Sequence, residues 1–267
     1  MTQSSRSLKP GDTEFEFGVA IPGTILPVDQ WAKTAIHRLP EGILDTQTLF
    51  GRVAPTVLDI GCGNGRFVIS SAVLRPQVDH IGIDILPVVI RYATRRGKER
   101  GLSNTRFAVC GGFDFLERHA ADNSFAEIHV YHPQPYANSE LASRRLLSPQ
   151  FLVQVHRTLQ PNGKLFLQSD NPSYWKYIRE SISQVMDWQE QTEPWLDYPL
   201  GISRRELIAT SKKLPIFRAI AIRRDMDADS FAAIASHLPQ PTFSAPPQSA
   251  RPQSARPQSK KTHRRKR

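Results

Sequence analysis

The sequence is poor in the features that mark secreted, metal-binding and membrane proteins. Its two cysteines, Cys62 and Cys110, are too few among 267 residues for a disulfide framework or a cysteine metal site. No apolar run is long enough to cross a membrane, and the first residues lead into polar sequence instead of a signal-peptide core. These absences predict a soluble, cytoplasmic protein without a membrane segment or a metal.

Acidic residues are missing from the last 29 residues, which hold eight Lys or Arg. The whole chain has 35 basic and 25 acidic residues, so the other 238 residues hold 27 against 25, and the net charge of +10 falls to +2. Residues 239–267 repeat Pro-Gln-Ser-Ala-Arg and carry little apolar surface, which predicts a disordered tail. The tail's charge suits RNA phosphates, and the alternative is a solvated tail without a role.

From residue 56 onward, short apolar runs alternate with helical patterns. This alternation predicts an α/β fold with a doubly wound, mostly parallel sheet. The expected domains are a partly mobile N-terminal extension (1–38), one main domain (39–238) and the tail (239–267). The expected strands are 56–60, 80–84, 106–109, 127–131, 164–169 and 217–223. The expected helices are 66–74, 87–100, 113–118, 149–159 and 173–186, with a short helical approach in 39–52.

Right-handed crossovers would bring the carboxyl ends of these strands to one edge of the sheet, where ligands bind in such folds. The expected edge residues are Asp59, Asp84, Tyr131 and Asp170.

A glycine loop follows the first of these strands. Residues 57–65 read VLDIGCGNG, an apolar strand leading into three glycines spaced one residue apart. Such glycines permit a sharp exit from the strand and a close approach of backbone N–H groups to a ligand. A dinucleotide fingerprint would have its third glycine where Arg66 stands. The spacing instead resembles the first motif of S-adenosylmethionine-dependent methyltransferases, with Asp59 as its acidic residue.

A carboxylate ends the second strand of the main domain, roughly 20 residues after the loop, where a ribose diol needs a paired acceptor. This is Asp84. The resemblance therefore implies S-adenosyl-L-methionine as the cofactor, with Asp59, Gly61, Gly63, Gly65 and Asp84 around it. The alternative is a purely structural turn, with Asp84 as a helix cap.

A second group of motifs begins after the fourth strand. Residues 132–136 read HPQPY and residues 144–152 read RRLLSPQFL. These resemble, without a gap, the Phe-Pro-Asp-Pro-Trp and Lys-Arg-Arg-Leu motifs and the Pro-x-Phe-Leu helix start of bacterial tRNA (guanine-N7-)-methyltransferases. SDN at 169–171 and SRRE at 203–206 are similar to the family's Thr-Asp-Asn and Thr-x-x-Glu. The likeness covers residues 40–224 and implies a class I, Rossmann-like methyltransferase that modifies N7 of a guanine in tRNA.

The resemblance also implies roles for single residues. It places Gln134, Asp170 and Glu206 at the guanine as catalytic residues and Gly111 at the cofactor. It makes Tyr136, Arg144, Arg145 and Ser203 substrate-binding residues. Each role has a plainer alternative: a capping box for Ser203 and Glu206, a helix cap for Asp170, packing for Tyr136, and a solvated helix entrance for the two arginines.

The chain also departs from the family pattern. Gln134 replaces the motif aspartate, residues 137–143 read ANSELAS in place of a basic loop, and CGG at 110–112 replaces Gly-Asp-Ala. These departures leave two alternatives to tRNA guanine methylation. One is a methyltransferase of the same fold that acts on another RNA or a small molecule. The other is a catalytically weak, cofactor-binding protein associated with RNA.

Overall fold

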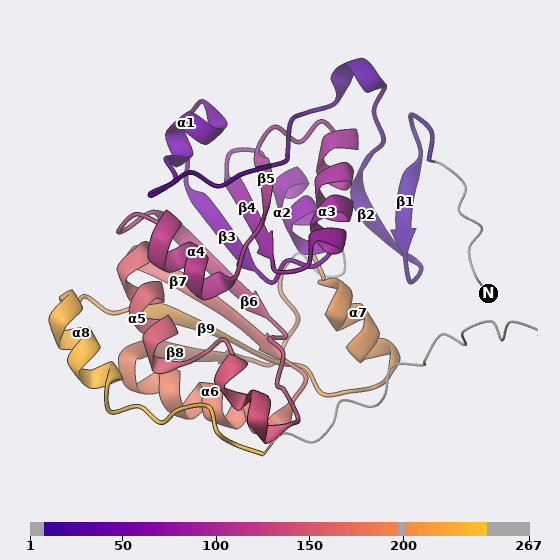
Figure 1. Cartoon of the computed structure of the whole chain (residues 1–267). Coiled ribbons are helices and arrows are strands. Elements are labelled where there is room, and N and C mark those ends of the chain that lie inside the picture. Colours follow the sequence, from indigo (N-terminus) through magenta and orange to yellow (C-terminus); the bar gives the residue numbers. More distant parts are fainter. Residues whose placement is uncertain (1–7, 197–200, 245–267) are drawn as a thin grey trace, which may run out of the picture.

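A computed structural model of the chain describes residues 8–196 and 201–244. Within these residues, seven strands form one sheet with the order β5-β4-β3-β6-β7-β9-β8, in which β9 alone runs against the others (Figure 1). The order confirms the predicted doubly wound, mostly parallel sheet. The seven strands are β3 (Thr56–Ile60), β4 (Asp79–Asp84), β5 (Thr105–Val109), β6 (Phe125–Tyr131), β7 (Leu159–Ser169), β8 (Met186–Gln191) and β9 (Phe217–Arg223).

Helices cover both faces of this sheet. Helices α2 and α3 pack on one face, and α4, α5 and α6 pack on the other, with α8 outside α5. Helix α7 lies near the carboxyl ends of the strands (Figure 1). The helices are α1 (Thr46–Phe50), α2 (Arg66–Leu74), α3 (Pro87–Glu99), α4 (Gly112–His119), α5 (Pro149–Thr158), α6 (Pro172–Val185), α7 (Arg204–Ser211) and α8 (Ala228–Ala235).

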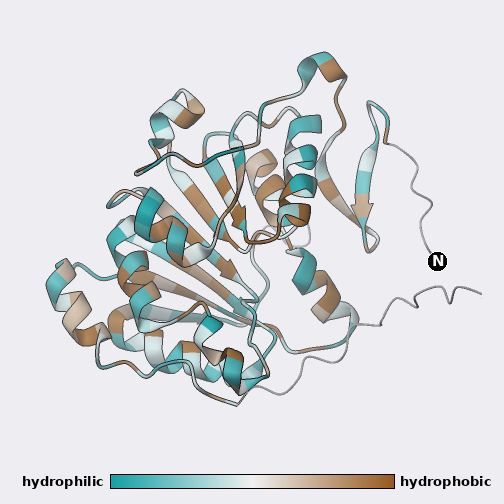
Figure 2. Cartoon of the chain, viewed as in Figure 1, coloured by the Kyte–Doolittle hydropathy of each residue, from teal (hydrophilic) through white to brown (hydrophobic). Residues whose placement is uncertain are grey.

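Local sequence explains most of these elements. All five residues of β3 are buried, as expected for a strand with neighbours on both sides and helices on both faces. Helices α3, α5 and α6 each begin with proline, whose missing N–H costs nothing in a first turn. Ser148 and Asn171 cap α5 and α6 by accepting from backbone N–H groups. Figure 2 shows the apolar residues concentrated in the central strands and on the inward sides of the helices.

The expected main-domain elements are present. The strands at 56–60 and 217–223 and the helix at 66–74 agree residue for residue, and most other ends differ by one or two residues. Two elements were missed: β8, a polar edge strand, and α8. The helical approach expected in 39–52 is wrong for most of its length, because only Thr46–Phe50 is helical, capped by Asp45 and ended by Gly51.

An antiparallel hairpin precedes the main domain, in a region where no element was predicted. It consists of β1 (Thr13–Glu16) and β2 (Val19–Thr24). Ile21 of β2 is fully buried against α2 and α3. Glu14 of β1 forms ion pairs with Arg96 and Arg100 of α3. The hairpin is therefore an integral part of the cofactor-side layer.

The first residues of the predicted tail pack on the main domain, so the predicted boundary at residue 239 is wrong. Phe243 lies against the rings of Tyr174 and Tyr177, and the Tyr177 hydroxyl donates to the Pro239 carbonyl. The rest of the predicted tail, 245–267, lies outside the described residues. None of the helices in the described ranges combines the length and apolarity that crossing a membrane requires. Over the same ranges, His, Cys, Asp and Glu side chains form no cluster that would hold a metal ion.

Candidate functional site

The glycine loop between β3 and α2 combines two kinds of glycine. Gly61, Gly63 and Gly65 all have positive φ, at 79°, 55° and 77°. A Cβ on Gly65 would lie 2.7 Å from the Ala93 Cβ, so this glycine lets α3 pack against the start of α2. A Cβ on Gly61 or Gly63 would meet nothing within 4 Å. The first two glycines therefore border open space, whereas the third is required for helix packing.

Asp84 closes the loop from the end of β4. Its Oδ2 accepts from the Gly63 N–H at 3.1 Å, and its Oδ1 accepts from the Leu86 N–H at 2.9 Å. Leu86 is the N-cap residue of α3, so the carboxylate orders the helix start as well as the glycine loop. Each carboxylate oxygen has a further lone pair with which it can accept from a ligand.

The acidic residue of the glycine motif is buried beneath the loop. Burial raises the pKa of Asp59 to about 8, and the negative charge of the neighbouring Asp84 raises it further in the same direction. Burial also raises the pKa of the Cys62 thiol, again with the help of Asp59 and Asp84. The region under the loop therefore has a strongly negative potential, which a bound cationic group would relieve.

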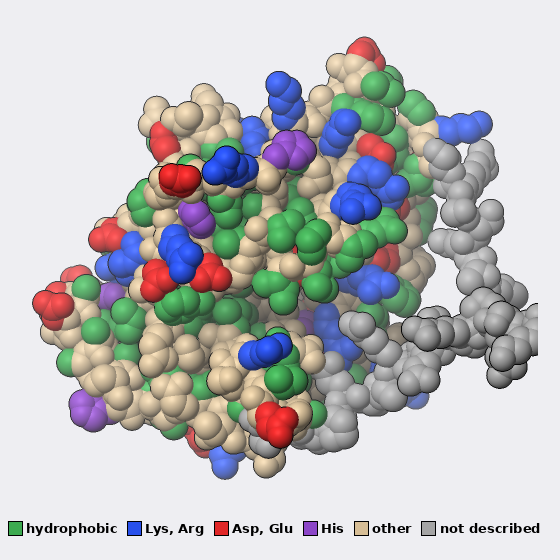
Figure 3. All heavy atoms as spheres, viewed as in Figure 1, with side chains coloured by type: hydrophobic (Ala, Val, Ile, Leu, Met, Phe, Trp, Pro, Cys, Tyr) green, Lys and Arg blue, Asp and Glu red, His purple; other side chains and the backbone are tan. Residues whose placement is uncertain are grey.

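An apolar patch adjoins Asp84 at the ends of β4 and β5. Figure 3 shows hydrophobic side chains gathered over the part of the molecule where α3 begins. Gly111, the N-cap of α4, lies beside this patch, since a Cβ on it would be 3.9 Å from Ile85 Cγ2 and 3.1 Å from Asp114 Oδ2. The exposed hydrophobic residues here are Ile85, Leu86, Val88, Tyr92 and Val109. Sequence reasoning missed this patch because it considered only glycines and polar groups as ligands.

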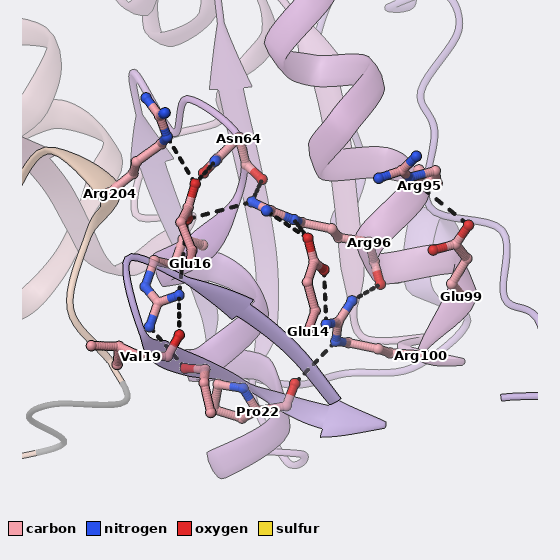
Figure 4. A network of polar contacts seen from close by, with 12 residues as sticks. Glu14, Glu16, Val19, Pro22, Asn64, Arg95, Arg96, Glu99, Arg100 and Arg204 are labelled. Carbon is pink, nitrogen blue, oxygen red and sulfur yellow. Dashed lines mark hydrogen bonds and ion pairs between the residues drawn. The ribbon is translucent and has the colours of Figure 1, made fainter. Parts of the chain in front are cut away.

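The N-terminal hairpin reaches the glycine loop through one carboxylate. Glu16 Oε1 accepts from Asn64 Nδ2 of the loop and from Arg204 Nε of α7, both at 2.8 Å (Figure 4). Glu16 also lies within ion-pair distance of Arg66 and Arg96. Glu14, two residues earlier, contacts only the α3 arginines among the pairs drawn in Figure 4. Glu16 therefore joins the cofactor loop to α7.

Arg66, which occupies the place of a dinucleotide glycine, has a structural role of its own. Its side chain is fully buried and donates to the carbonyls of Val19, Ala20 and Ile202. It thereby holds both the hairpin and the entrance to α7 against the first turn of α2.

The loop after β6 carries the residues of the HPQPY motif. Gln134 is exposed, and Tyr136 is half-buried with a φ of 43°. His132 also has positive φ, at 52°, and its side chain is 1% exposed. The His132 N–H donates to the Gln168 carbonyl at 2.8 Å, which fixes the loop to the end of β7.

Asp170 is the centre of an ion pair network at the end of β7. Its Oδ1 is 3.3 Å from His132 Nδ1, and its other oxygen pairs with Arg205 of α7. Burial alone would raise the pKa of Asp170, but the hydrogen bonds and positive charges of His132 and Arg205 lower it to about 2. Asp170 is thus an anion already matched by two partners. Its proposed cap function belongs instead to the next residue, Asn171, which caps α6.

Glu206 is buried and fully engaged under α7. Its Oε1 pairs with Arg218 of β9, and its Oε2 accepts from Gln168 Nε2 at 3.0 Å. Ser203 caps α7 by accepting from the Glu206 N–H at 3.1 Å. The alternative of a capping box is therefore only half correct, because the Glu206 carboxylate turns toward the sheet instead of back to the Ser203 N–H.

The two arginines that were expected to bind substrate have different environments. Arg144 is exposed at the end of a short helix, η2 (Ser139–Arg144). Arg145 is 3% exposed, and its guanidinium donates to four backbone carbonyls and stacks on the Phe243 ring. Contact with a phosphate is incompatible with this arrangement, so the expectation for Arg145 is corrected to a structural role. The carbonyls belong to Pro135, Tyr136, Pro241 and Phe243.

The structure brings the acceptor-side residues into one cluster with partners that sequence reasoning missed. These partners are His132, Gln168, Trp195, Arg205 and Arg218. The available signal was the strand period of two, which places residues 166, 168 and 170 on one face of β7. Nothing in the local sequence pointed to Trp195, which lies against Tyr131 and Phe166 from beyond β8.

Comparisons with known proteins agree with this geometry. A family model described as "Putative methyltransferase" matches residues 53–219. The tRNA (guanine-N(7)-)-methyltransferase of Alcanivorax borkumensis is 32% identical over 157 residues, covering 59% of this chain and 64% of that protein. The enzyme of the same name from Geobacillus kaustophilus is 32% identical over 162 residues, covering 58% and 74%. The match to the Alcanivorax protein thus spans less than two thirds of that relative's length.

Among solved structures, the 16S rRNA methyltransferase KamB is 17% identical to this chain and aligns with a TM-score of 0.52. The alignment covers 72% of this chain and 98% of KamB. This similarity shows a shared Rossmann-like methyltransferase fold.

Proposed function

The chain belongs to the family of putative methyltransferases, and on that premise we propose that it transfers a methyl group from S-adenosylmethionine to N7 of a guanine in tRNA. One observation carries this proposal: the glycine loop closed by Asp84 adjoins, along the same sheet edge, the cluster of Asp170 and Glu206. The domain that carries the activity spans 8–244, hairpin included, and acts in the cytoplasm.

The residues around the glycine loop fit the proposed cofactor. Open space at Gly61 and Gly63 leaves room for a ligand against the backbone, and Asp84 has lone pairs for a ribose diol. The apolar patch around Ile85 suits an adenine ring. The negative potential at Asp59 suits a molecule with a sulfonium and an ammonium group. Asn64 Oδ1, buried in the loop without a partner, is a further free acceptor. When bound, the cofactor supplies an electrophilic methyl group.

The chemistry demands little of the acceptor side. Guanine N7 has an exposed lone pair, so its bond to the methyl carbon forms without a general base while the sulfur keeps the electrons of the broken bond. The protein's task is to align N7 with the methyl group and to stabilise the positive charge that develops on the purine. Gln134 offers a neutral acceptor for this task, whereas Asp170 and Glu206 supply negative charge that is largely matched by Arg205 and Arg218.

One observation favours a second candidate function. Both acceptor-side carboxylates are paired internally, and Gln134 is exposed and uncharged. A site with so little net negative charge also suits an acceptor other than guanine in tRNA, such as another RNA or a small molecule. Chemical cleavage mapping of N7-methylguanine, in tRNA from cells with and without the gene, separates the two candidates.

Cofactor binding is tested independently of the acceptor. We expect titration calorimetry to detect S-adenosylhomocysteine binding, and Asp84→Ala to weaken it by about tenfold or more, because paired acceptors of a buried diol are lost. Exposed Asp114→Ala in α4 is the matched control, with an affinity near the parent's. Binding of NAD without any response to S-adenosylhomocysteine would contradict the proposed cofactor.

Affinity for tRNA is proposed to come largely from the basic tail. The described body is nearly balanced in charge, and all eight tail cations lie in 245–267, outside the described residues. Because 239–244 packs on the body, truncation after Ser244 removes the charges without disturbing Phe243. We expect the truncated protein to bind tRNA more weakly, with a shallower salt dependence, by about 0.7 to 0.9 per lost phosphate contact. Equal affinity and salt slope in filter binding would leave the tail without this role.

A further inference from the structure

Buried polar atoms without hydrogen-bond partners gather at one place in the molecule. Among the described residues nine such side-chain atoms exist, and four of them lie at the carboxyl ends of β6 and β7 and around α7. They are His132 Nε2, Gln168 Oε1, Trp195 Nε1 and Arg218 Nε. Since an unpaired buried polar atom is costly, a group of four indicates a place where a polar ligand belongs.

The topology places these atoms on the same face of the sheet. Gln168 lies opposite Tyr131 on β6 and Arg218 on β9, so the three side chains share one face. The Trp195 ring lies 6.2 Å from the Tyr131 ring and 5.6 Å from the Phe166 ring, on that same face. His132 follows Tyr131 directly and bonds to Asp170, two residues beyond Gln168. The unpaired atoms therefore surround the end of β6, where the acceptor must approach the methyl group.

The carboxylates at family positions do not fill this role. Asp170 is matched by His132 and Arg205, and Glu206 by Arg218 and Gln168. Gln134 is exposed in the loop outside the cluster. The hydrogen-bonding capacity that remains free belongs to other side chains.

We propose that His132, Gln168 and Trp195 bind the Watson–Crick edge of the acceptor guanine and determine the choice of base; this inference rests on the proposed function. Trp195 Nε1 can only donate and suits O6 of guanine, whereas Gln168 Oε1 can only accept and suits N1–H or the amino group. The His132 Nδ1 that faces the Asp170 carboxylate carries a proton, so the Nε2 of the neutral ring is a second acceptor.

This set of one donor and two acceptors distinguishes the purines. Guanine presents an acceptor at position 6 and donors at N1 and at its amino group, which complements the three side chains. Adenine presents a donor at position 6, opposite the Trp195 N–H, and an acceptor at N1, and would leave the buried groups unpaired. A base held by this edge keeps N7 free for the methyl group. Arg218, whose charge is matched by Glu206, completes the wall of the site.

Because the four atoms are closed to solvent, the base reaches them when the contacts of α7 with the strand ends loosen. These contacts are the ion pair between Arg205 and Asp170 and the hydrogen bond between Glu206 and Gln168. The Arg205 side chain is 30% exposed, so it is the outer of the two contacts.

The test compares methylation rates of the full-length protein and variants on a tRNA transcript whose acceptor guanosine has been mapped. Trp195→Phe keeps the ring contacts and removes only the N–H, and Gln168→Met keeps the shape and removes the amide. Each should lower kcat/KM by about tenfold, the effect of one lost buried hydrogen bond. Trp188→Phe on β8, whose ring packs against Trp175, is the matched control and should keep the parent's rate. Unchanged thermal unfolding and S-adenosylhomocysteine affinity would exclude a folding defect.

A second comparison uses the substrate. Inosine lacks the amino group of guanosine, so the parent should methylate a transcript with inosine at the mapped position about tenfold more slowly. That penalty should shrink in Gln168→Met or in His132→Phe, because one acceptor of the amino group is gone. Parent-like rates for Trp195→Phe and Gln168→Met, or an inosine penalty that no variant changes, would overturn the inference alone. A parent that methylates no guanine at N7 would overturn the proposed function together with it.

Discussion

The cofactor side and the acceptor side of the sheet edge are built in different ways. Around the glycine loop, ligand-facing groups are mostly backbone, ordered by glycines and by the bonds of Asp84 to Gly63 and Leu86. Around the ends of β6 and β7, the groups are side chains from β6, β7, α7 and β9 that pair with one another. A site of backbone geometry depends on short segments, whereas a site of paired side chains depends on how distant segments meet.

The largest expected effect separates two glycines of the cofactor loop. Gly65→Val places side-chain atoms against Ala93 and Phe107 at a positive φ, so we expect a loss of about 3 kcal/mol or more in the free energy of unfolding. Gly63→Val meets open space, so its stability should fall far less, by about 1–2 kcal/mol of backbone strain. S-adenosylhomocysteine binding should nevertheless be lost, because the side chain fills the ligand's space. Urea unfolding and calorimetry measure both; equal destabilisation by the two variants would contradict the assignment.

The second effect concerns pH, and its sign differs between the two sides. The pKa of Asp59, about 8, lies above its ordinary value, so the stability it contributes is full below pH 4 and is lost as the pH rises through 8. The pKa of Asp170, about 2, lies below its ordinary value, so its contribution is full above pH 4 and is lost as the pH falls through 2.

Asp59→Asn should therefore stabilise the ligand-free protein at pH 8.5 by on the order of a few kcal/mol relative to its effect at pH 5. Asp170→Asn should lose its destabilising effect only near pH 2. Urea midpoints across this range give both results. A constant difference between Asp59→Asn and the parent from pH 5 to pH 8.5 would show that Asp59 does not titrate there.

The third effect is a gain on the acceptor side. If guanine is the substrate, Gln134→Asp restores a charge opposite the purine as it becomes cationic. Charged hydrogen bonds exceed neutral ones by about 1 kcal/mol or more, so we expect the rate to rise by about tenfold. Gln150→Asp, at an exposed position of α5, is a control for added charge. A slower Gln134→Asp variant in single-turnover methylation would show that the site is built around the amide and would favour another acceptor.

The smallest effect tests the link between the two sides. Glu16 joins the glycine loop to α7 through Asn64 and Arg204, whereas the neighbouring Glu14 pairs with α3. Glu16→Gln should raise KM for the cofactor by about threefold, the effect of a partly exposed ion pair. Glu14→Gln should lower the unfolding midpoint without changing KM. If the two variants behave alike in both measurements, the hairpin has only a structural role.

Local spacing in the sequence determined the cofactor side of this protein. The glycine loop, the carboxylate at the end of β4 and most helix and strand positions follow from periods of 2 and 3.6 residues and from capping residues, which act over a few positions. The order of the parallel strands follows from right-handed crossovers, so the edge shared by Asp59, Asp84 and Asp170 was predictable as well.

Only the tertiary structure decided what the acceptor-side residues do. Arg145 reads as a surface cation, yet it is buried because carbonyls nearly 100 residues away accept its hydrogen bonds. Glu206 reads as a capping residue, yet Arg218 and Gln168 take its carboxylate. The hairpin has no distinctive pattern and gains its place from ion pairs with α3. The physical reason is the same in each case: a charged side chain takes the partner that compensates its burial, and that partner comes from a distant segment.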